Sequence, residues 1–155
     1  MDDSPHGIRM IDVGGKPVSA RTARATGRLR AHPETIRRIR AGNLEKGDAV
    51  AVARLAGIMA AKRTADIVPL CHPLPLDAIT VSVTFDAPDS VAIEAVVTAV
   101  ARTGVEMEAL LAVTAAALTL YDMCKSIDPS MSVDEVRLEE KRGGTRGDYS
   151  RGIGR

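Results

Sequence analysis

Asp122 and Lys125 form the first pair of side chains in this sequence that could exchange protons with a bound molecule. They stand three positions apart, so a helix would place both on one face. An uncharged run, residues 109–121, comes immediately before them. The spacing leaves two interpretations open. The pair is either an ordinary ion pair worth about 0.3 kcal/mol, or a partly buried acid–base pair whose pKa values are shifted by its surroundings.

A second group lies in a proline-rich segment. Leu70, Cys71 and His72 stand between Pro69 and Pro73, and the two prolines restrict the backbone. A histidine held in a rigid segment is suited to binding a ligand or moving a proton. The alternative is that the prolines only turn the chain and that His72 packs as an ordinary core residue.

Two carboxylates, Glu106 and Glu108, flank Met107 at the start of the longest predicted helix. Thr103 and Glu106 have the spacing of a capping box, in which the side chains bond to backbone N–H groups of the first turn. Glu108 has no such structural role and precedes the uncharged stretch. On a helix the two carboxylates point in roughly opposite directions, so we expect them to have different roles.

Basic residues are concentrated near both ends of the chain. The formal net charge is only +1, but residues 1–46 carry +5, residues 47–136 carry −7 and residues 137–155 carry +3. Lys46 precedes a predicted helix N-terminus, where phosphate binds readily, and Lys141 lies in a basic run that ends in two glycines. The basic ends are either simply solvated, or they fold back over a site and supply cations to a phosphorylated small molecule.

The composition excludes several classes of function. Aromatic residues make up 2% of the chain and Trp is absent, which argues against a nucleic-acid platform that stacks bases on rings. No charge-free apolar run reaches the roughly 18 residues that span a bilayer. Residues 1–6 do not resemble a signal peptide, so we expect a cytoplasmic protein with no membrane partner. Cys71 and Cys124 are a poor zinc signature and a poor disulfide framework, and we expect both to be reduced thiols.

The predicted elements give these residues a common scaffold. Small or apolar residues alternate with arginines over residues 19–31, which predicts a strand with one arginine-lined face. The three prolines of residues 64–78 exclude a regular helix there. Helices are expected over 33–42, 48–63 and 103–124, and further strands over 79–85, 91–100 and 132–138. This order favours an α+β, ferredoxin-like βαββαβ sandwich, with the helices on one face of an antiparallel sheet.

Length and composition predict a single domain over 1–155. The helix over 103–124 is apolar on every face along its middle. A chain of 155 residues has little material to bury such a helix, so we expect it to lie at a subunit interface.

No single motif of this sequence identifies a protein family, but the motifs together are far more specific. In chain order they are Met10-Ile11-Asp12-Val13-Gly14, Lys46-Gly47-Asp48, Ala56–Thr64, Ile67–Leu74, Thr103–Leu110, Tyr121–Lys125 and Lys141–Gly144. In this combination the sequence resembles the cyclic pyranopterin monophosphate synthase family of molybdenum cofactor biosynthesis. The resemblance covers about residues 10–147, and the motifs occur in the family's order. It implies that these residues form the core of the domain and that residues 148–155, which lie beyond it, form a flexible tail.

The resemblance implies a specific enzyme. Members convert 3′,8-cyclo-7,8-dihydroguanosine triphosphate into cyclic pyranopterin monophosphate and release pyrophosphate, a lyase reaction that needs no redox cofactor and no obligatory metal. They are ferredoxin-like subunits that form a homohexamer, a trimer of dimers, with each site shared across a dimer interface. By motif match, Asp122 and Lys125 are the catalytic pair. The substrate-binding positions implied in the same way are Leu70, Cys71, His72, Met107 and Glu108, with Lys46, Glu106 and Lys141 as further active-site positions.

Two departures from the family pattern affect these expectations. The family's tail usually reads Lys-Ser-Gly after the paired glycines, whereas this chain has Thr145-Arg146-Gly147, so Arg146 is the candidate replacement for the missing cation. Leu111 stands where the family more often has Thr, which indicates a change in packing. The alternative function is a non-catalytic ferredoxin-like module that binds a purine or pterin phosphate, although a pure binder has no use for the Asp122 and Lys125 pair.

Overall fold

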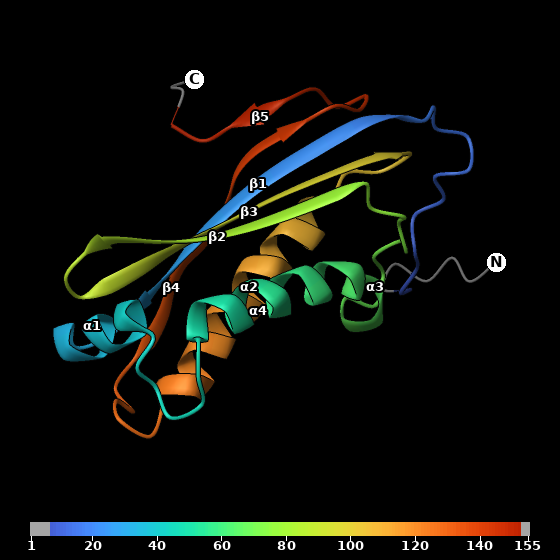
Figure 1. The fold of residues 1–155 in the computed structure, drawn as a ribbon. Coiled ribbons are helices and arrows are strands. Elements are labelled where there is room, and N and C mark those ends of the chain that lie inside the picture. Colours follow the sequence, from blue (N-terminus) through green and yellow to red (C-terminus); the bar gives the residue numbers. More distant parts are fainter. Residues whose placement is uncertain (1–6, 153–155) are drawn as a thin grey trace.

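The computed structural model describes residues 7–152 of the chain. A five-stranded antiparallel sheet in the order β2-β3-β1-β4-β5 forms one layer, and the helices lie on one side of it (Figure 1). The strands are β1 (Ser19–Arg30), β2 (Ala78–Ala87), β3 (Ser90–Ala101), β4 (Ser132–Arg142) and β5 (Tyr149–Ser150); the helices are α1 (Pro33–Ala41), α2 (Ala49–Lys62), α3 (Thr64–Ile67) and α4 (Glu106–Cys124). The predicted α+β ferredoxin-like sandwich is confirmed.

β1 lies in the middle of the sheet and follows the predicted alternation. Ala23, Ala25 and Leu29 are fully buried on the helix side. Gly27 completes this row, because a Cβ atom there would lie 2.7 Å from Val113 Cγ1 of α4. The small residues of β1 therefore let α4 pack directly against the centre of the sheet.

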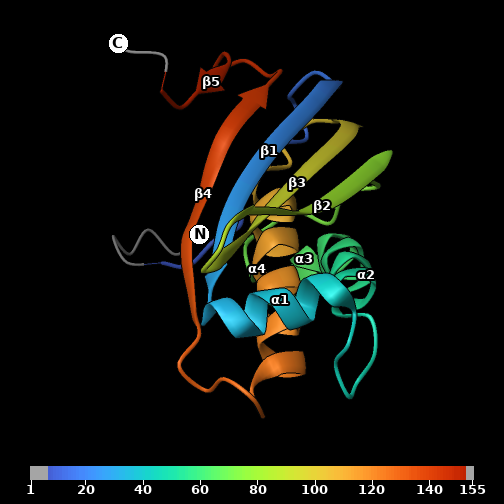
Figure 2. The same cartoon turned by 60° about the vertical axis from the view of Figure 1, so that its left-hand side comes forward.

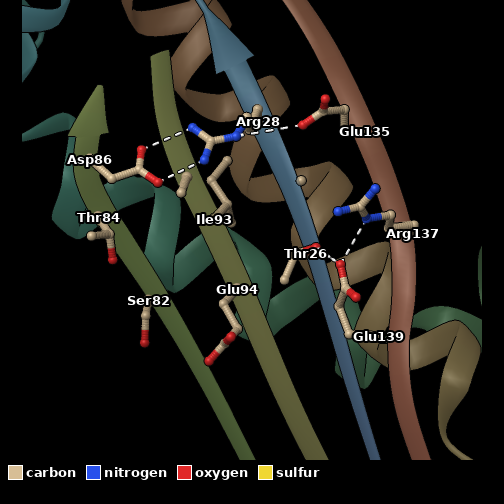
Figure 3. Close-up of a pocket in the computed structure, with 12 residues that line it drawn as sticks. Thr26, Arg28, Ser82, Thr84, Asp86, Ile93, Glu94, Glu135, Arg137 and Glu139 are labelled. Atoms are coloured by element: carbon tan, nitrogen blue, oxygen red, sulfur yellow. Dashed lines mark hydrogen bonds and ion pairs between the residues drawn. The ribbon is translucent and has the colours of Figure 1, made fainter. Parts of the chain in front are cut away.

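No helix of residues 7–152 lies on the opposite face of the sheet (Figure 2). That face carries ion pairs between arginines and carboxylates. Arg24, Arg28 and Arg30 of β1 each have a carboxylate oxygen within 3.0 Å, contributed by β3, β2 and β4 respectively. Figure 3 shows part of this ladder, in which Arg28 contacts Asp86 of β2 and Glu135 of β4. The arginine-lined face thus cross-links four strands and has little unpaired positive charge for a ligand.

α2 begins where the sequence predicts it. Asp48 caps its N-terminus, with the carboxylate Oδ1 accepting a hydrogen bond from the Ala51 N–H at 3.1 Å. α3 follows immediately, so the expectation of no helix over 64–78 is wrong for its first four residues. Pro69 comes after this short helix, so its own fixed φ and its restriction of Val68 both fall outside the helix. The remainder of the segment contains no helix.

α4 begins at Glu106, and the predicted capping box is wrong. The Thr103 hydroxyl donates to the carbonyl of Gly104 at 3.2 Å instead of bonding to the first turn of the helix. Val105 occupies the N-cap and provides no capping side chain. Glu106 is therefore free for another role.

About half of α4 is buried within the chain, between the sheet and α2. The two helices approach closely at Gly57, where a Cβ atom would lie 2.9 Å from the carbonyl oxygen of Ala112. Among the described residues α4 alone is long and apolar enough to cross a membrane, but half of its most apolar window is buried inside the chain. Of its large apolar side chains, Met107 and Leu118 remain exposed.

The chain after β4 turns back beside that strand. Tyr149 and Ser150 form β5 and pair with Lys141 and Glu140, and the Gly143 N–H donates to the Asp148 carboxylate at 3.0 Å. Part of the tail expected to be flexible is thus a short strand, because β4 offers its backbone groups as partners. Residues 153–155 of that tail, and residues 1–6 considered for a signal peptide, lie outside the described residues.

The loop between α4 and β4 is joined to the start of α1 by Asp128, which is 1% exposed. Its carboxylate accepts hydrogen bonds from the His32 N–H at 2.9 Å, the Thr35 hydroxyl at 3.0 Å and the Ser130 hydroxyl at 2.6 Å. Burial opposes ionisation, but these bonds outweigh it and lower the pKa of Asp128 to about 2. This carboxylate supplies the N-terminal cap that α1 otherwise lacks.

Candidate active site

A cavity of about 420 Å³ lies at the end of the molecule where α4 begins. It is formed by the segment before β1, the start of β1, the loop after α3, the start of α4, the end of β4 and the loop that follows it. We call it the arm cavity. Six of the residues predicted for the site line it: Leu70, Cys71, His72, Glu106, Met107 and Lys141.

The arm cavity is rich in cations that come from distant parts of the sequence. Lys16 precedes β1, Arg102 follows β3 and Arg146 follows β4. The predicted folding-back of the basic ends is therefore seen in Lys16 and Arg146. Arg146 also lines the cavity together with Thr145, which places a cation near the position where the family pattern differs from this chain.

Arg21 is a cavity residue that the motifs missed. It lies on β1 in phase with the buried alanines and is 9% exposed. Its Nε donates to the carbonyl of Ala101 at 3.3 Å, and its Nη2 donates to the carbonyl of Arg102 at 3.1 Å. The sequence contained one signal for Arg21: it has the same phase as the small buried residues in the alternation of β1. An arginine in such a row requires a specific environment.

The paired glycines after β4 cover this arginine. Gly143 and Gly144 have φ values of +91° and +95°, which side-chain-bearing residues rarely adopt. A Cβ atom on Gly144 would collide with the Arg21 guanidinium. The two glycines therefore let the backbone lie directly against the charged group at the cavity wall.

Glu106 and Glu108 have different surroundings, as the helical geometry predicts. Glu106 faces the cavity, with its Oε1 atom 3.6 Å from Lys141 Nζ. Glu108 is 3% exposed, and its Oε1 accepts a long hydrogen bond from Cys71 Sγ at 3.8 Å. Within residues 7–152, its Oε2 has no hydrogen-bond partner. Burial raises the pKa of the Glu108 carboxyl, and burial together with Glu108 raises the pKa of the Cys71 thiol.

Asp122, Lys125 and Lys46 form a second cluster at the other end of α4. Asp122 Oδ1 lies 2.8 Å from Lys125 Nζ, and Asp122 Oδ2 lies 3.0 Å from Lys46 Nζ. Hydrogen bonds from Lys125 and then Lys46 lower the pKa of Asp122, and the bond to Asp122 raises the pKa of Lys125. In this chain the pair is exposed, with 55% of the Asp122 side chain and 58% of the Lys125 side chain accessible.

One chain does not bring the two groups together. Asp122 lies sixteen residues after Glu106 on the same helix, which corresponds to about 24 Å along the helix axis. The arm cavity and the Asp122 cluster are thus two separate half-sites on one chain. Within residues 7–152 no three His, Cys, Asp or Glu side chains are grouped so that they could hold a metal ion.

Comparisons with known proteins agree with the motifs. Residues 10–144 match the model of the MoaC family. A cyclic pyranopterin monophosphate synthase of Chloroflexus aurantiacus is 55% identical over 152 residues, covering 97% of this chain and 93% of the relative. Cyclic pyranopterin monophosphate synthases 1 and 3 of Mycobacterium tuberculosis are 53% and 52% identical over 149 residues, covering 96% of this chain and 88% and 84% of those relatives.

Proposed function

This chain belongs to the MoaC family, and on that premise we propose that it is the enzyme that converts 3′,8-cyclo-7,8-dihydroguanosine triphosphate into cyclic pyranopterin monophosphate. The reaction releases pyrophosphate, is of the lyase class and is a step of molybdenum cofactor biosynthesis. A charged triphosphate does not cross membranes unaided, so a cytoplasmic location is part of the proposal. The observation that carries it is the division of the predicted residues into a cation-rich cavity and an acid–base cluster.

The two half-sites match the two needs of this substrate. The triphosphate requires cations, which the arm cavity contains. Opening and reclosing the ring system requires proton transfer, and the Asp122 cluster holds an ionised carboxylate beside an ammonium group. The lowered pKa of Asp122 keeps it ionised and the raised pKa of Lys125 keeps it protonated, so at neutral pH one group can accept a proton and the other carries one. Both shifts oppose the transfer itself, which is most efficient when the pKa values lie near the operating pH.

We further propose that a complete site forms only between two subunits. The separation of about 24 Å along α4 is too great for both half-sites of one chain to contact one substrate molecule. A second copy can bring its Asp122 cluster to the arm cavity of the first. Site sharing across dimers within a homohexamer, a trimer of dimers, satisfies this requirement.

The outer face of α2 supports an assembly. Val52, Leu55 and Met59 lie on one side of this helix at helical spacing, and they are 44%, 58% and 50% exposed. An apolar stripe of this kind is costly in water and is suited to packing against another copy. The Asp122 cluster is exposed in a single chain, so coverage by a partner would also strengthen its electrostatic interactions.

Turnover by mixed variants tests both the reaction and the shared site. Asp122→Asn and His72→Ala are each expected to remove turnover of the cyclised triphosphate while keeping the fold and the oligomer. When the two variants are refolded or expressed together, half of the dimers are mixed and one of their two sites is intact, so about a quarter of the wild-type activity returns. Each variant incubated with itself is the control.

The outcomes separate the two parts of this proposal. Absence of product from folded wild-type protein refutes the enzyme assignment, and substrate binding without product would support the non-catalytic module instead. Activity in the wild type with no recovery in the mixture refutes the shared site. A stable monomer in light scattering would contradict the proposed assembly.

A further inference from the structure

The chain after β4 forms a strap beside one wall of the arm cavity. We use the word strap for residues 143–151. Its loop carries Thr145 and Arg146, both of which line the cavity, and it ends in β5, which pairs with the end of β4 (Figure 1). The match to the family model ends at residue 144. Family membership therefore does not explain why the rest of this segment is present.

The start of the strap is fixed against β1 by its two glycines. A Cβ atom on Gly143 would collide with the carbonyl oxygen of Ala20, and one on Gly144 would collide with the Arg21 guanidinium. Both glycines have positive φ values, so the backbone follows a path that other residues rarely adopt. The strap thus enters the cavity wall in close contact with the start of the central strand.

The end of the strap is fixed by hydrogen bonds. The Asp148 carboxylate accepts a bond from the Gly143 N–H at 3.0 Å, which joins the two ends of the loop. The Arg151 N–H donates to the carbonyl of Glu139 at 2.8 Å, and the Arg151 Nε donates to the carbonyl of Leu138 at 2.9 Å. Asp148 therefore closes the loop, and Arg151 joins β5 to the edge of β4.

These bonds are the main restraint on the loop. None of the strap side chains is buried, so apolar packing contributes little. Within residues 7–152, the Arg146 side chain makes no hydrogen bond or ion pair, and its place at the cavity is set by the backbone of the strap. A segment held in this way opens more readily than the core of the sheet. Loss of one bond is expected to increase the open population about fivefold.

We propose that Asp148 and Arg151 are positioning residues, which anchor the strap and thereby hold Thr145 and Arg146 at the wall of the arm cavity before the substrate binds. Neither anchoring residue lines the cavity, so both act through the loop. The inference rests on the proposed function for the identity of the substrate. A loop that is already ordered reduces the entropic cost of binding. Loosening it is therefore expected to raise KM and to leave kcat nearly unchanged.

Limited digestion of the purified oligomer with trypsin, followed by mass spectrometry, measures how often the strap opens. The bond between Arg146 and Gly147 is a tryptic site within the strap, and its cleavage requires local opening. Asp148→Ala removes the acceptor for the Gly143 N–H and is expected to speed cleavage at this bond about fivefold. Arg151→Pro removes both the N–H and the side-chain donor, so at least about tenfold faster cleavage is expected.

Two control variants separate the hydrogen bond from the charge. Asp148→Asn keeps an oxygen that can accept the same bond, so cleavage within about twofold of the wild type is expected. Asp89→Ala removes a carboxylate from an exposed position of the β2–β3 turn and is expected to behave in the same way. Wild-type cleavage in both Asp148→Ala and Arg151→Pro, or equally fast cleavage in Asp148→Asn and Asp148→Ala, would overturn the proposed anchoring.

Initial rates with the cyclised triphosphate test the positioning role. KM is expected to rise about fivefold in Asp148→Ala, with kcat within about twofold of the wild type, and to return to the wild-type value in Asp148→Asn. Simple loss of folded enzyme would lower kcat and leave KM unchanged. Faster cleavage of the strap with an unchanged KM would overturn the positioning role.

The two measurements also separate this proposal from the proposed function. Absence of product from the folded wild type removes the function and, with it, the positioning role, whereas the digestion still decides whether Asp148 and Arg151 anchor the strap. Product formation by a wild type whose strap is not stabilised by these residues leaves the function intact and removes the inference.

Discussion

Replacement of Asp128 by Asn is expected to destabilise the protein at neutral pH without removing any group from the two half-sites. The carboxylate is buried and receives bonds from the backbone of His32 and the side chains of Thr35 and Ser130. An amide keeps the shape but turns a donor toward groups that need an acceptor. The start of α1 and the α4–β4 loop would lose their common partner.

The pH dependence follows from the pKa of Asp128. The folded value of about 2 lies below the model value of 3.8, and such a difference corresponds to about 2.4 kcal/mol of stability at neutral pH. Because the pKa is lowered by folding, this stability is complete above about pH 4. It is lost as the pH falls through the folded value. The effect of the Asn substitution is therefore large at pH 7 and shrinks in acid.

The loss of stability is measured by urea unfolding at each pH. The protein concentration is kept fixed, because the apparent stability of an oligomer depends on it. We expect Asp128→Asn to lower the free energy of unfolding by about 2 kcal/mol at pH 7 and to lower Tm by about 4–8 °C. Asp89→Asn, at an exposed position of the β2–β3 turn, is the control and should change little. A loss that is the same at pH 7 and at pH 3, or no loss at all, would refute the role assigned to Asp128.

Two other substitutions test the packing and the buried carboxyl. Gly57→Ala places a methyl group 2.9 Å from the Ala112 carbonyl oxygen, so it should force α2 away from α4 and cost about 1–3 kcal/mol in urea unfolding; wild-type stability would contradict the close approach. Glu108→Gln should raise Tm at pH 7, because the pKa of Glu108 is raised by burial and its ionised form therefore opposes folding as pH rises through that pKa. The gain should diminish at lower pH, and a lower Tm at pH 7 would contradict it.

The sequence was sufficient to predict the scaffold because its local patterns agree with the packing. The alternation in β1 separates alanines from arginines, and the structure buries one set and pairs the other with acids. Asp48 marks the start of α2 as a side-chain cap. Such features depend on neighbours close in the chain, so they can be predicted from the sequence alone.

Tertiary contacts decided the features that the sequence did not predict. Thr103 and Glu106 have capping-box spacing, but α4 starts after Thr103 and Glu106 lies beside Lys141. The small surface of Gly57 lets α2 cover part of the apolar helix α4, whereas Leu118 of α4 stays exposed, so its predicted place at a subunit interface stays a prediction. Arg21 lines the arm cavity because the glycines after β4 lie against its guanidinium, a contact that the sequence does not indicate.

The motifs predicted the candidate site residues, but they did not predict that these residues lie in two separate groups on one chain. Motif order predicts which residues belong to a site, but it contains no distances. Helix α4 keeps the Asp122 cluster about 24 Å from Glu106 along its axis. A site that needs both must come from two chains, which is a property of the assembly.

The most direct test of the proposed function is a turnover assay on the purified protein with the cyclised GTP intermediate, measuring cyclic pterin phosphate and pyrophosphate together. We expect the two products in equal amounts from the wild type, and at least about 100-fold slower formation by folded, assembled Asp122→Asn. A folded, assembled wild-type protein that forms neither product would contradict the assignment.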